Sequence, residues 1–187
     1  MRFLSNFKLR AGVIGCGLLF PLAGFASHPL FAPFTSLDTP MMDVQGVYQD
    51  QVTFECALRE GEWRYCAEFN YYDLPVFAQF FSDDAQINRV QLELVSSAFY
   101  LSQLQFNLRR DGFQPRRVSY GEHDFNVQEA LKHSTSEVVD RQLIELINQR
   151  PINSVLSMQW VKSSNELLIE AKIQDDGVDL VLEMTRQ

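Results

Sequence analysis

Histidine and cysteine are scarce in this chain, with three of each among 187 residues. No Gly-x-Ser-x-Gly motif offers a serine nucleophile to the histidines, which are His28, His123 and His133. Nucleophilic catalysis needs a nucleophile, a base and a group that orients the base, so this composition disfavours a hydrolase. The remaining enzyme hypothesis centres on His123, because the carboxylates of Glu122 and Asp124 flank it and carboxylates tune imidazoles.

Signatures of metals and cofactors are missing as well. Cys56 and Cys66 are separated by nine residues and have no His or Cys pair nearby, so they lack the short ligand spacings of zinc sites. The acidic pairs at 83–84 and 175–176 lack the remaining ligands of a calcium loop. No phosphate-binding loop or dinucleotide fingerprint is present. We therefore expect neither a metal nor a cofactor.

Basic residues are outnumbered, with 16 Lys and Arg against 24 Asp and Glu and a net charge of −8. Nucleic acids and anionic membrane surfaces both favour proteins rich in Lys and Arg. The composition therefore argues against a nucleic-acid partner. No internal repeat, low-complexity tract or second long apolar run follows the N-terminus, so we expect no transmembrane span in the exported chain.

The N-terminus has the three-part pattern of a secretory signal peptide. Three basic residues stand among the first ten, residues 11–26 are apolar or small, and Gly24 and Ala26 precede the expected cleavage site. This pattern predicts a signal peptide over 1–26 and a periplasmic or secreted protein. The alternative is a lipoprotein anchored through Cys16, whose preceding residues resemble a lipobox but leave an unusually short apolar region before the cut.

Residues 27–46 contain three prolines without a regular apolar period, which predicts an extended leader. Its residues Phe31, Phe34 and Met41 are expected to be held in the core; the alternative is that they contact a partner. Residues 47–187 are expected to form a single α+β domain.

A disulfide-bonded hairpin is predicted early in this domain. Apolar residues alternate with polar ones on both sides of Glu60-Gly61, a turn sequence in which glycine accepts a positive φ. In an exported chain, Cys56 and Cys66 are expected to form a disulfide. A two-residue turn, however, would place Cys56 opposite Tyr65 and would direct the two cysteines to different faces. We therefore predict a β-bulge, near Gly61 or along the second strand of the hairpin, together with the bond.

The middle of the domain gives weaker patterns. They predict a short helix over 73–81 and strands over 90–94, 98–108 and 117–120. Asn126-x-x-Glu129 and Ser134-x-x-Glu137 both resemble capping boxes. The second precedes the main predicted helix, residues 135–149, which has apolar residues at helical spacing and is followed by Pro151.

The C-terminus alternates as three strands, over 156–160, 167–173 and 178–184. An Asp176-Gly177 turn would pair Ile173 with Leu180 and gather the apolar residues of the last two strands on one face. That face needs a cover, which the helix over 135–149 would provide. The predicted fold is α+β, with an antiparallel sheet of hairpins and a C-terminal meander packed against one main helix.

Two groups of residues are candidate contact sites. Four arginines surround one turn and could meet an anion or an acidic partner: Arg109, Arg110, Arg116 and Arg117. The alternative is that they pair with the protein's own carboxylates. Four aromatic residues could line a groove: Tyr72, Phe77, Phe80 and Phe81. The alternative is that these rings belong to the core.

Secretion, acidity, a disulfide and the missing catalytic motifs together favour a non-catalytic binding protein of the periplasm. Such a protein would act on a protein partner in the cell envelope, as an inhibitor, an immunity-type protein or an assembly factor. The second hypothesis is a small-ligand or lipid binder that uses the aromatic groove and the arginine turn. A hydrolase centred on His123 is the third.

Overall fold

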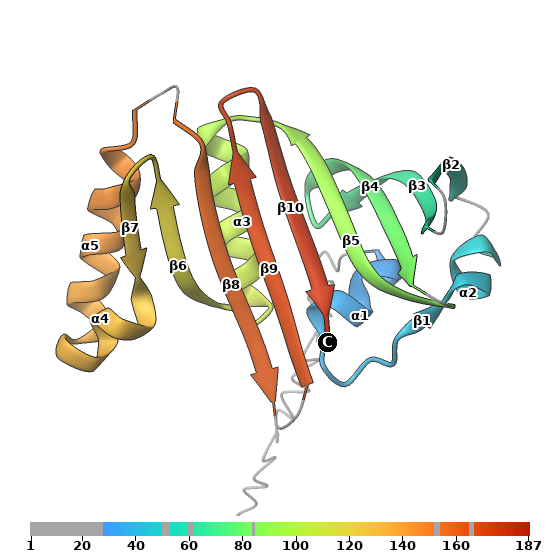
Figure 1. The fold of residues 1–187 in the computed structure, drawn as a ribbon, viewed down its shortest axis with the longest axis horizontal. Coiled ribbons are helices and arrows are strands. Elements are labelled where there is room, and N and C mark those ends of the chain that lie inside the picture. Colours follow the sequence, from blue (N-terminus) through green and yellow to red (C-terminus); the bar gives the residue numbers. More distant parts are fainter. Residues whose placement is uncertain (1–27, 50–52, 60–61, 84, 152–153, 165–166) are drawn as a thin grey trace, which may run out of the picture.

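The computed structural model describes residues 28–49, 53–59, 62–83, 85–151, 154–164 and 167–187. Its strands form one sheet in the order β2-β3-β4-β5-β10-β9-β8-β6-β7, with β1 paired to β5 and neighbouring strands antiparallel (Figure 1). The predicted α+β class is therefore confirmed. The expected signal peptide over 1–26, including Cys16, lies outside the described residues.

The strands are β1 (Met42–Asp43), β2 (Phe54–Arg59), β3 (Glu62–Tyr71), β4 (Leu74–Asp83), β5 (Gln86–Val95), β6 (Gln114–Tyr120), β7 (His123–Asn126), β8 (Leu156–Ser164), β9 (Leu167–Asp175) and β10 (Asp179–Arg186). The helices are the 3-10 helix η1 (Pro29–Phe31), α1 (Ala32–Thr35), α2 (Val44–Gln49), α3 (Ala98–Arg110), α4 (Val127–His133) and α5 (Ser136–Asn148). None of the described helices is long and apolar enough to cross a bilayer.

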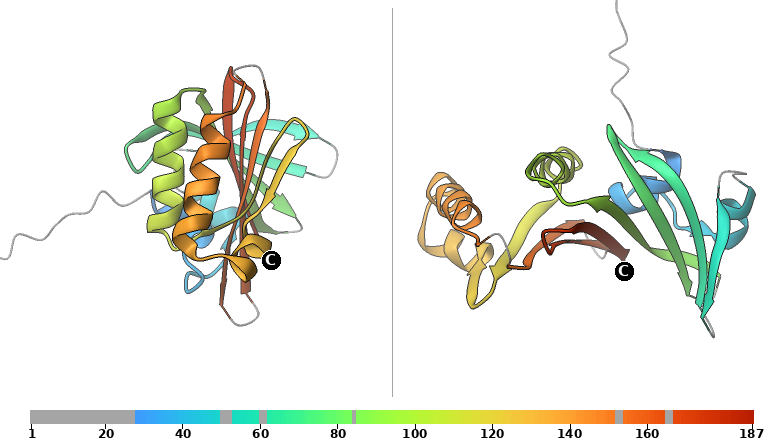
Figure 2. Two further views of the ribbon diagram at one scale, coloured as in Figure 1. Left: turned by 90° about the vertical axis from the view of Figure 1, so that its left-hand side faces the viewer. Right: turned by 90° about the horizontal axis from the view of Figure 1, so that it is seen from above.

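The sheet has one covered face and one uncovered face. α3 and α5 lie side by side against the covered face, and α1 covers its β5 side (Figure 2). Strand alternation explains the division, because Leu180, Leu182 and Met184 of β10 are buried under the helices while Val181 and Glu183 point the other way. We call the uncovered side the open face.

The C-terminal meander is confirmed, but its predicted register is wrong by two residues. The structure pairs Ile173 with Leu182 instead of Leu180. The turn is centred on Gly177-Val178, closed by the Asp176 N–H donating to the Asp179 carbonyl at 3.3 Å. Gly177 has φ 93°, and a type II′ hairpin turn favours glycine at this first central position. Side chains alternate between the two faces of a strand, so a shift of two residues leaves each side chain on its predicted face and the apolar face is unchanged.

Two predicted elements are wrong in type. Of residues 73–81, expected as a helix, Asp73 lies in a turn and 74–81 belong to β4, whose even-numbered residues Leu74, Val76, Ala78 and Phe80 are buried. Residues 98–108, expected as a strand, belong to α3. Its buried Leu101, Leu104 and Leu108 have helical spacing, and its first turn is capped by the Ser97 hydroxyl, which accepts the Tyr100 N–H at 3.1 Å.

The main predicted helix is confirmed as α5, and the capping box before α4 is confirmed in part. The Asn126 side chain accepts the Glu129 N–H at 3.1 Å, as the first box requires. The second predicted box is wrong, because α5 is capped at Thr135 and that residue makes no side-chain capping bond.

The predicted leader is described from residue 28 to 46, where it is partly helical rather than extended. Phe31 and Phe34 are fully buried, which confirms that they are held in the core. Two cations also bind carbonyl groups of this segment. Lys162 Nζ donates to Thr35 O at 2.6 Å, and Arg186 donates to the carbonyl oxygens of Pro33, Ser36, Leu37 and Thr39. The segment is thus built into the fold.

The predicted disulfide is confirmed, and a bulge accompanies it, but the bulge lies on the first strand of the hairpin, β2, and not near Gly61 or along the second strand as predicted. Cys56 and Cys66 are bonded, with their Cα atoms 5.7 Å apart. The register of β2 and β3 shifts between Glu55 and Ala57, so Cys56 is the inserted residue and Tyr65 faces Glu55 instead. The predicted Glu60-Gly61 turn lies outside the described residues. A disulfide of this kind indicates an extracytoplasmic compartment.

Replacing both cysteines by serine is expected to lower the free energy of unfolding by about 2–3 kcal/mol, because the bond closes a short loop in the unfolded chain. Urea denaturation of the double variant and the wild type measures this loss. An unfolding midpoint equal to that of the wild type would show that the bond contributes nothing.

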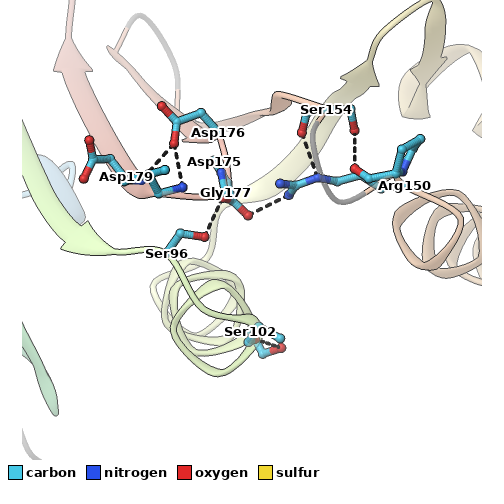
Figure 3. Close-up of polar contacts among 11 residues, drawn as sticks. Ser96, Ser102, Arg150, Ser154, Asp175, Asp176, Gly177 and Asp179 are labelled. Atoms are coloured by element: carbon cyan, nitrogen blue, oxygen red, sulfur yellow. Dashed lines mark hydrogen bonds and ion pairs between the residues drawn. The ribbon is translucent and has the colours of Figure 1, made fainter.

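A buried ionic network joins three connections at one end of the sheet (Figure 3). Asp175, with 4% of its surface exposed, accepts hydrogen bonds from Arg150 Nη1 and Ser96 Oγ, each at 2.6 Å, and from the Gly177 N–H at 2.9 Å. Arg150 also donates to the Ser154 carbonyl at 3.0 Å. One carboxylate therefore ties the β5–α3 junction and the α5–β8 connection to the β9–β10 turn.

Candidate binding face

The four predicted arginines do not form one cluster. Arg109 lies in the last turn of α3 with its guanidinium 5.4 Å from the Trp160 ring, on the helix side of the sheet. Arg116 and Arg117 lie on β6, where a register shift next to Arg116 directs both side chains to the open face. Arg116 is 3.2 Å from Glu170.

The fourth arginine belongs to a separate contact at the end of α3. The Arg110 guanidinium lies 3.5 Å from the centroid of the Tyr72 ring. The hydroxyls of Tyr71 and Tyr72 both donate to the Asp111 carboxylate. Burial raises the pKa of Asp111, and burial together with this carboxylate raises the pKa of Tyr72 to about 12. Tyr72 has φ 56°, an uncommon conformation for a residue with a side chain, which this contact holds in place.

The predicted aromatic residues also lie apart. Phe80 is fully buried in the core under the helices. Phe81 lies on the open face between Arg64 and Arg89, whose guanidinium carbons are 4.9 and 4.0 Å from its ring centroid. Phe77 is half-buried and lines a shallow hollow at the end of the β3–β4 hairpin. No single groove collects these rings with Tyr72 in the described structure.

The described histidines are not arranged as a catalytic group. The His123 ring lies 4.8 Å from the Tyr120 ring, while the neighbouring Asp124 carboxylate is bound by Arg117 at 2.6 Å. The Arg117 hydrogen bonds lower the pKa of Asp124. Within the described ranges, no group of three or more His, Cys, Asp or Glu side chains is placed to hold a metal ion.

The strands assemble a polar surface on the open face. Its side chains come from every second residue of β3 to β10 and are mostly half-buried. The charged members are Arg64, Glu68, Arg89, Glu93, Arg116, Arg117, Asp124, Glu170, Lys172 and Glu183. Acidic and basic groups are balanced here, although the whole chain carries a net charge of −8.

Two adjoining hollows indent the open face and share Gln159 in their walls. The central hollow, of about 170 Å³, is lined by Glu170, Lys172 and Glu183 among others. The second, of about 250 Å³, lies against the turn between β6 and β7 and includes Ser157. Viewed from above, the sheet arches over this face (Figure 2). The hollows are too small and polar for a typical apolar ligand pocket.

Most charges on the open face are already paired across strands. Gln79 and Gln91 donate to one Glu93 carboxylate oxygen at 2.6 and 2.8 Å, and Arg89 is 3.7 Å from Glu183. Lys172 differs, because it makes no hydrogen bond or ion pair with the described residues although it is half-buried. Its ammonium is therefore available to a carboxylate of a partner. Strand alternation identifies which residues point outward, but strand order is needed to bring them together.

Comparison with known proteins gives no match: no family model, curated protein or solved structure is significantly similar to this chain.

Proposed function

We propose that this is an exported periplasmic protein that acts without catalysis, by binding a protein partner in the cell envelope as an inhibitor or as an assembly factor. The observation that carries the proposal is the open face. It is a broad, indented sheet surface with no described element over it and with balanced charges. Among the described residues, the half-buried ammonium of Lys172 on this face has no hydrogen-bond or ion-pair partner. Such a surface suits the polar, charge-matched contacts of a protein interface.

The other two hypotheses receive less support from the geometry. A lipid or small-ligand site would need the aromatic rings and arginines in one place, and they are distributed over both faces of the sheet. A hydrolase would need His123 to contact a nucleophile, whereas its described contact is an aromatic ring.

The test is capture from the protein's own envelope with matched lysine variants. Chemical crosslinking followed by affinity purification is expected to recover one stoichiometric partner with the wild type. Lys172→Glu reverses the free charge of the open face and should reduce recovery at least about tenfold, equivalent to about 1.4 kcal/mol. Lys132→Glu, on exposed α4, should leave recovery unchanged.

Circular dichroism and thermal melting of each variant establish that the fold is retained. Equal recovery with wild type and Lys172→Glu would exclude the open face as the binding surface. The absence of any stoichiometric partner would overturn the proposed function itself.

A further inference from the structure

The carboxylates that line the central hollow of the open face are already paired. Glu183 on β10 and Glu170 on β9 both line this hollow. Arg89 lies 3.7 Å from Glu183, and Arg116 donates to Glu170 at 3.2 Å. Lys172 lines the same hollow, so its positive charge is in excess of these arginine–carboxylate pairs.

Lys172 has a hydrogen-bonding neighbour that is also without a partner. Glu183 of β10 lies directly opposite it on one side, and Gln159 of β8 lies directly opposite it on the other. Side chains opposite each other in an antiparallel pair have their Cβ atoms about 5 Å apart. Among the described residues, neither Lys172 nor Gln159 makes a side-chain hydrogen bond. The hollow therefore offers an ammonium donor and an amide donor side by side.

Covering the open face would take water away from this ammonium. Burying a charge is costly unless a group of opposite charge pairs with it, and the nearby carboxylates are held by arginines. The central hollow of about 170 Å³ is also smaller than the roughly 300–1,000 Å³ of a small-molecule pocket. It therefore suits one acidic side chain that projects from a larger molecule.

We infer that the central hollow binds one aspartate or glutamate side chain of the protein partner and that Lys172 is the residue that selects it. The Lys172 ammonium donates to one carboxylate oxygen, and the Gln159 amide is placed to donate to the other. This inference rests on the proposed function and names the group on the partner that the open face recognises.

A single carboxylate suits this face better than an acidic patch. Further acidic groups on the partner would approach Glu93, Glu170 and Glu183, which point outward on the same face. The whole chain carries a net charge of −8, which attracts a partner whose surface is basic. The inferred partner therefore presents one acidic side chain within a basic or neutral surface.

Zero-length crosslinking tests the inference on the wild-type chain. A carbodiimide condenses an amine with a carboxylate that contacts it and leaves no spacer between them. Treatment of isolated envelopes, followed by affinity purification and peptide mass spectrometry, is expected to show Lys172 joined to an aspartate or glutamate of the partner. Lys132→Arg is the control, because Lys132 contacts Glu129 of its own helix, and it should keep this link. A recovered partner without a link to Lys172 would overturn the inference.

Two substitutions of Lys172 separate its charge from its reactivity. Lys172→Arg keeps the charge but has no amine for the carbodiimide, so it should lose the link while uncrosslinked recovery of the partner stays within about threefold of wild type. Lys172→Gln removes the charge and should lower recovery at least about tenfold, because the partner's carboxylate is left buried without a counter-charge. Equal recovery with both variants would contradict a carboxylate in the hollow.

The results also distinguish failure of this inference from failure of the proposed function. If the wild type recovers no stoichiometric partner, both are wrong. If Lys172→Glu lowers recovery but Lys172→Gln does not, and no carbodiimide link to Lys172 forms, the carboxylate is wrong and the open face remains the binding surface. Circular dichroism and thermal melting establish that each variant retains the fold.

Discussion

Asp175→Ala is expected to lower the free energy of unfolding by about 3–5 kcal/mol, a large part of the stability of a domain of this size. The substitution leaves the Arg150 guanidinium in a mostly buried position without its carboxylate. It also removes the acceptor of the Ser96 hydroxyl and of the Gly177 N–H. Urea denaturation followed by circular dichroism measures the loss.

Asp124→Ala is the matched control, because Asp124 also meets an arginine at 2.6 Å but both side chains are exposed. Water replaces an exposed partner at little cost, so this variant should unfold close to the wild type. Equal free energies of unfolding for Asp175→Ala and Asp124→Ala would contradict the prediction. They would show that burying the Arg150–Asp175 pair does not increase the stability lost when its carboxylate is removed.

The effect of Asp175 also has a defined pH dependence. Burial by itself would raise the pKa of this carboxyl, but the hydrogen bonds from Arg150, Ser96 and Gly177 bring its pKa below the ordinary value. A group whose pKa is lower in the folded state stabilises the fold above its unfolded pKa, about 3.9, and loses that contribution on acidification. The difference between wild type and Asp175→Asn should therefore be constant near neutral pH and shrink as pH falls below about 4.

The sequence predicts the strands that have one apolar and one polar face, because a helix rarely produces period-two alternation. The sequence pattern predicts a strand at 98–108, which is wrong, because the leucines and aromatic residues there fit a strand and a helix equally well. The deciding features are the Ser97 cap and the contact of Leu104 and Leu108 with the sheet, and only the first is local. It fails at 73–81 for a related reason, because Asp73 and Pro75 suit a helix start as well as a hairpin turn.

The candidate face is less predictable than the fold. Alternation indicates that Lys172 and Glu183 point outward from their strands, but sequence does not bring β6 beside β8 or β5 beside β10. Conversely, the arginines that are close in sequence are separated by the structure. A turn places Arg110 and Arg116 on different elements, and each meets a different partner. Proximity in sequence is a poor guide when the residues belong to a helix and a strand on opposite sides of a turn.

Phe31→Ala is expected to lower the free energy of unfolding by about 3–5 kcal/mol, the usual cost of removing a buried aromatic ring. Phe31 is 0% exposed, and its ring centroid lies 5.6, 5.7 and 5.9 Å from those of Tyr71, Phe69 and Phe80. Thermal and urea unfolding of the purified variant provide the measurement. Phe54→Ala, at a 53% exposed position, is the control and should cost far less.

The outcome decides what the segment before the sheet contributes. Proline-rich residues after an expected signal peptide suggest a leader that the fold could lose without harm, and Phe31→Ala would then change stability little. The contacts indicate the opposite, since Arg186 and Lys162 bind the carbonyl groups of this segment while its phenylalanines fill the space beneath β3 and β4. Among the described residues, no helix as long as α3 or α5 lies over that half of the sheet, and the phenylalanine rings cover it instead. Removing a ring should therefore expose the apolar side of the strands and unfold the protein at lower denaturant.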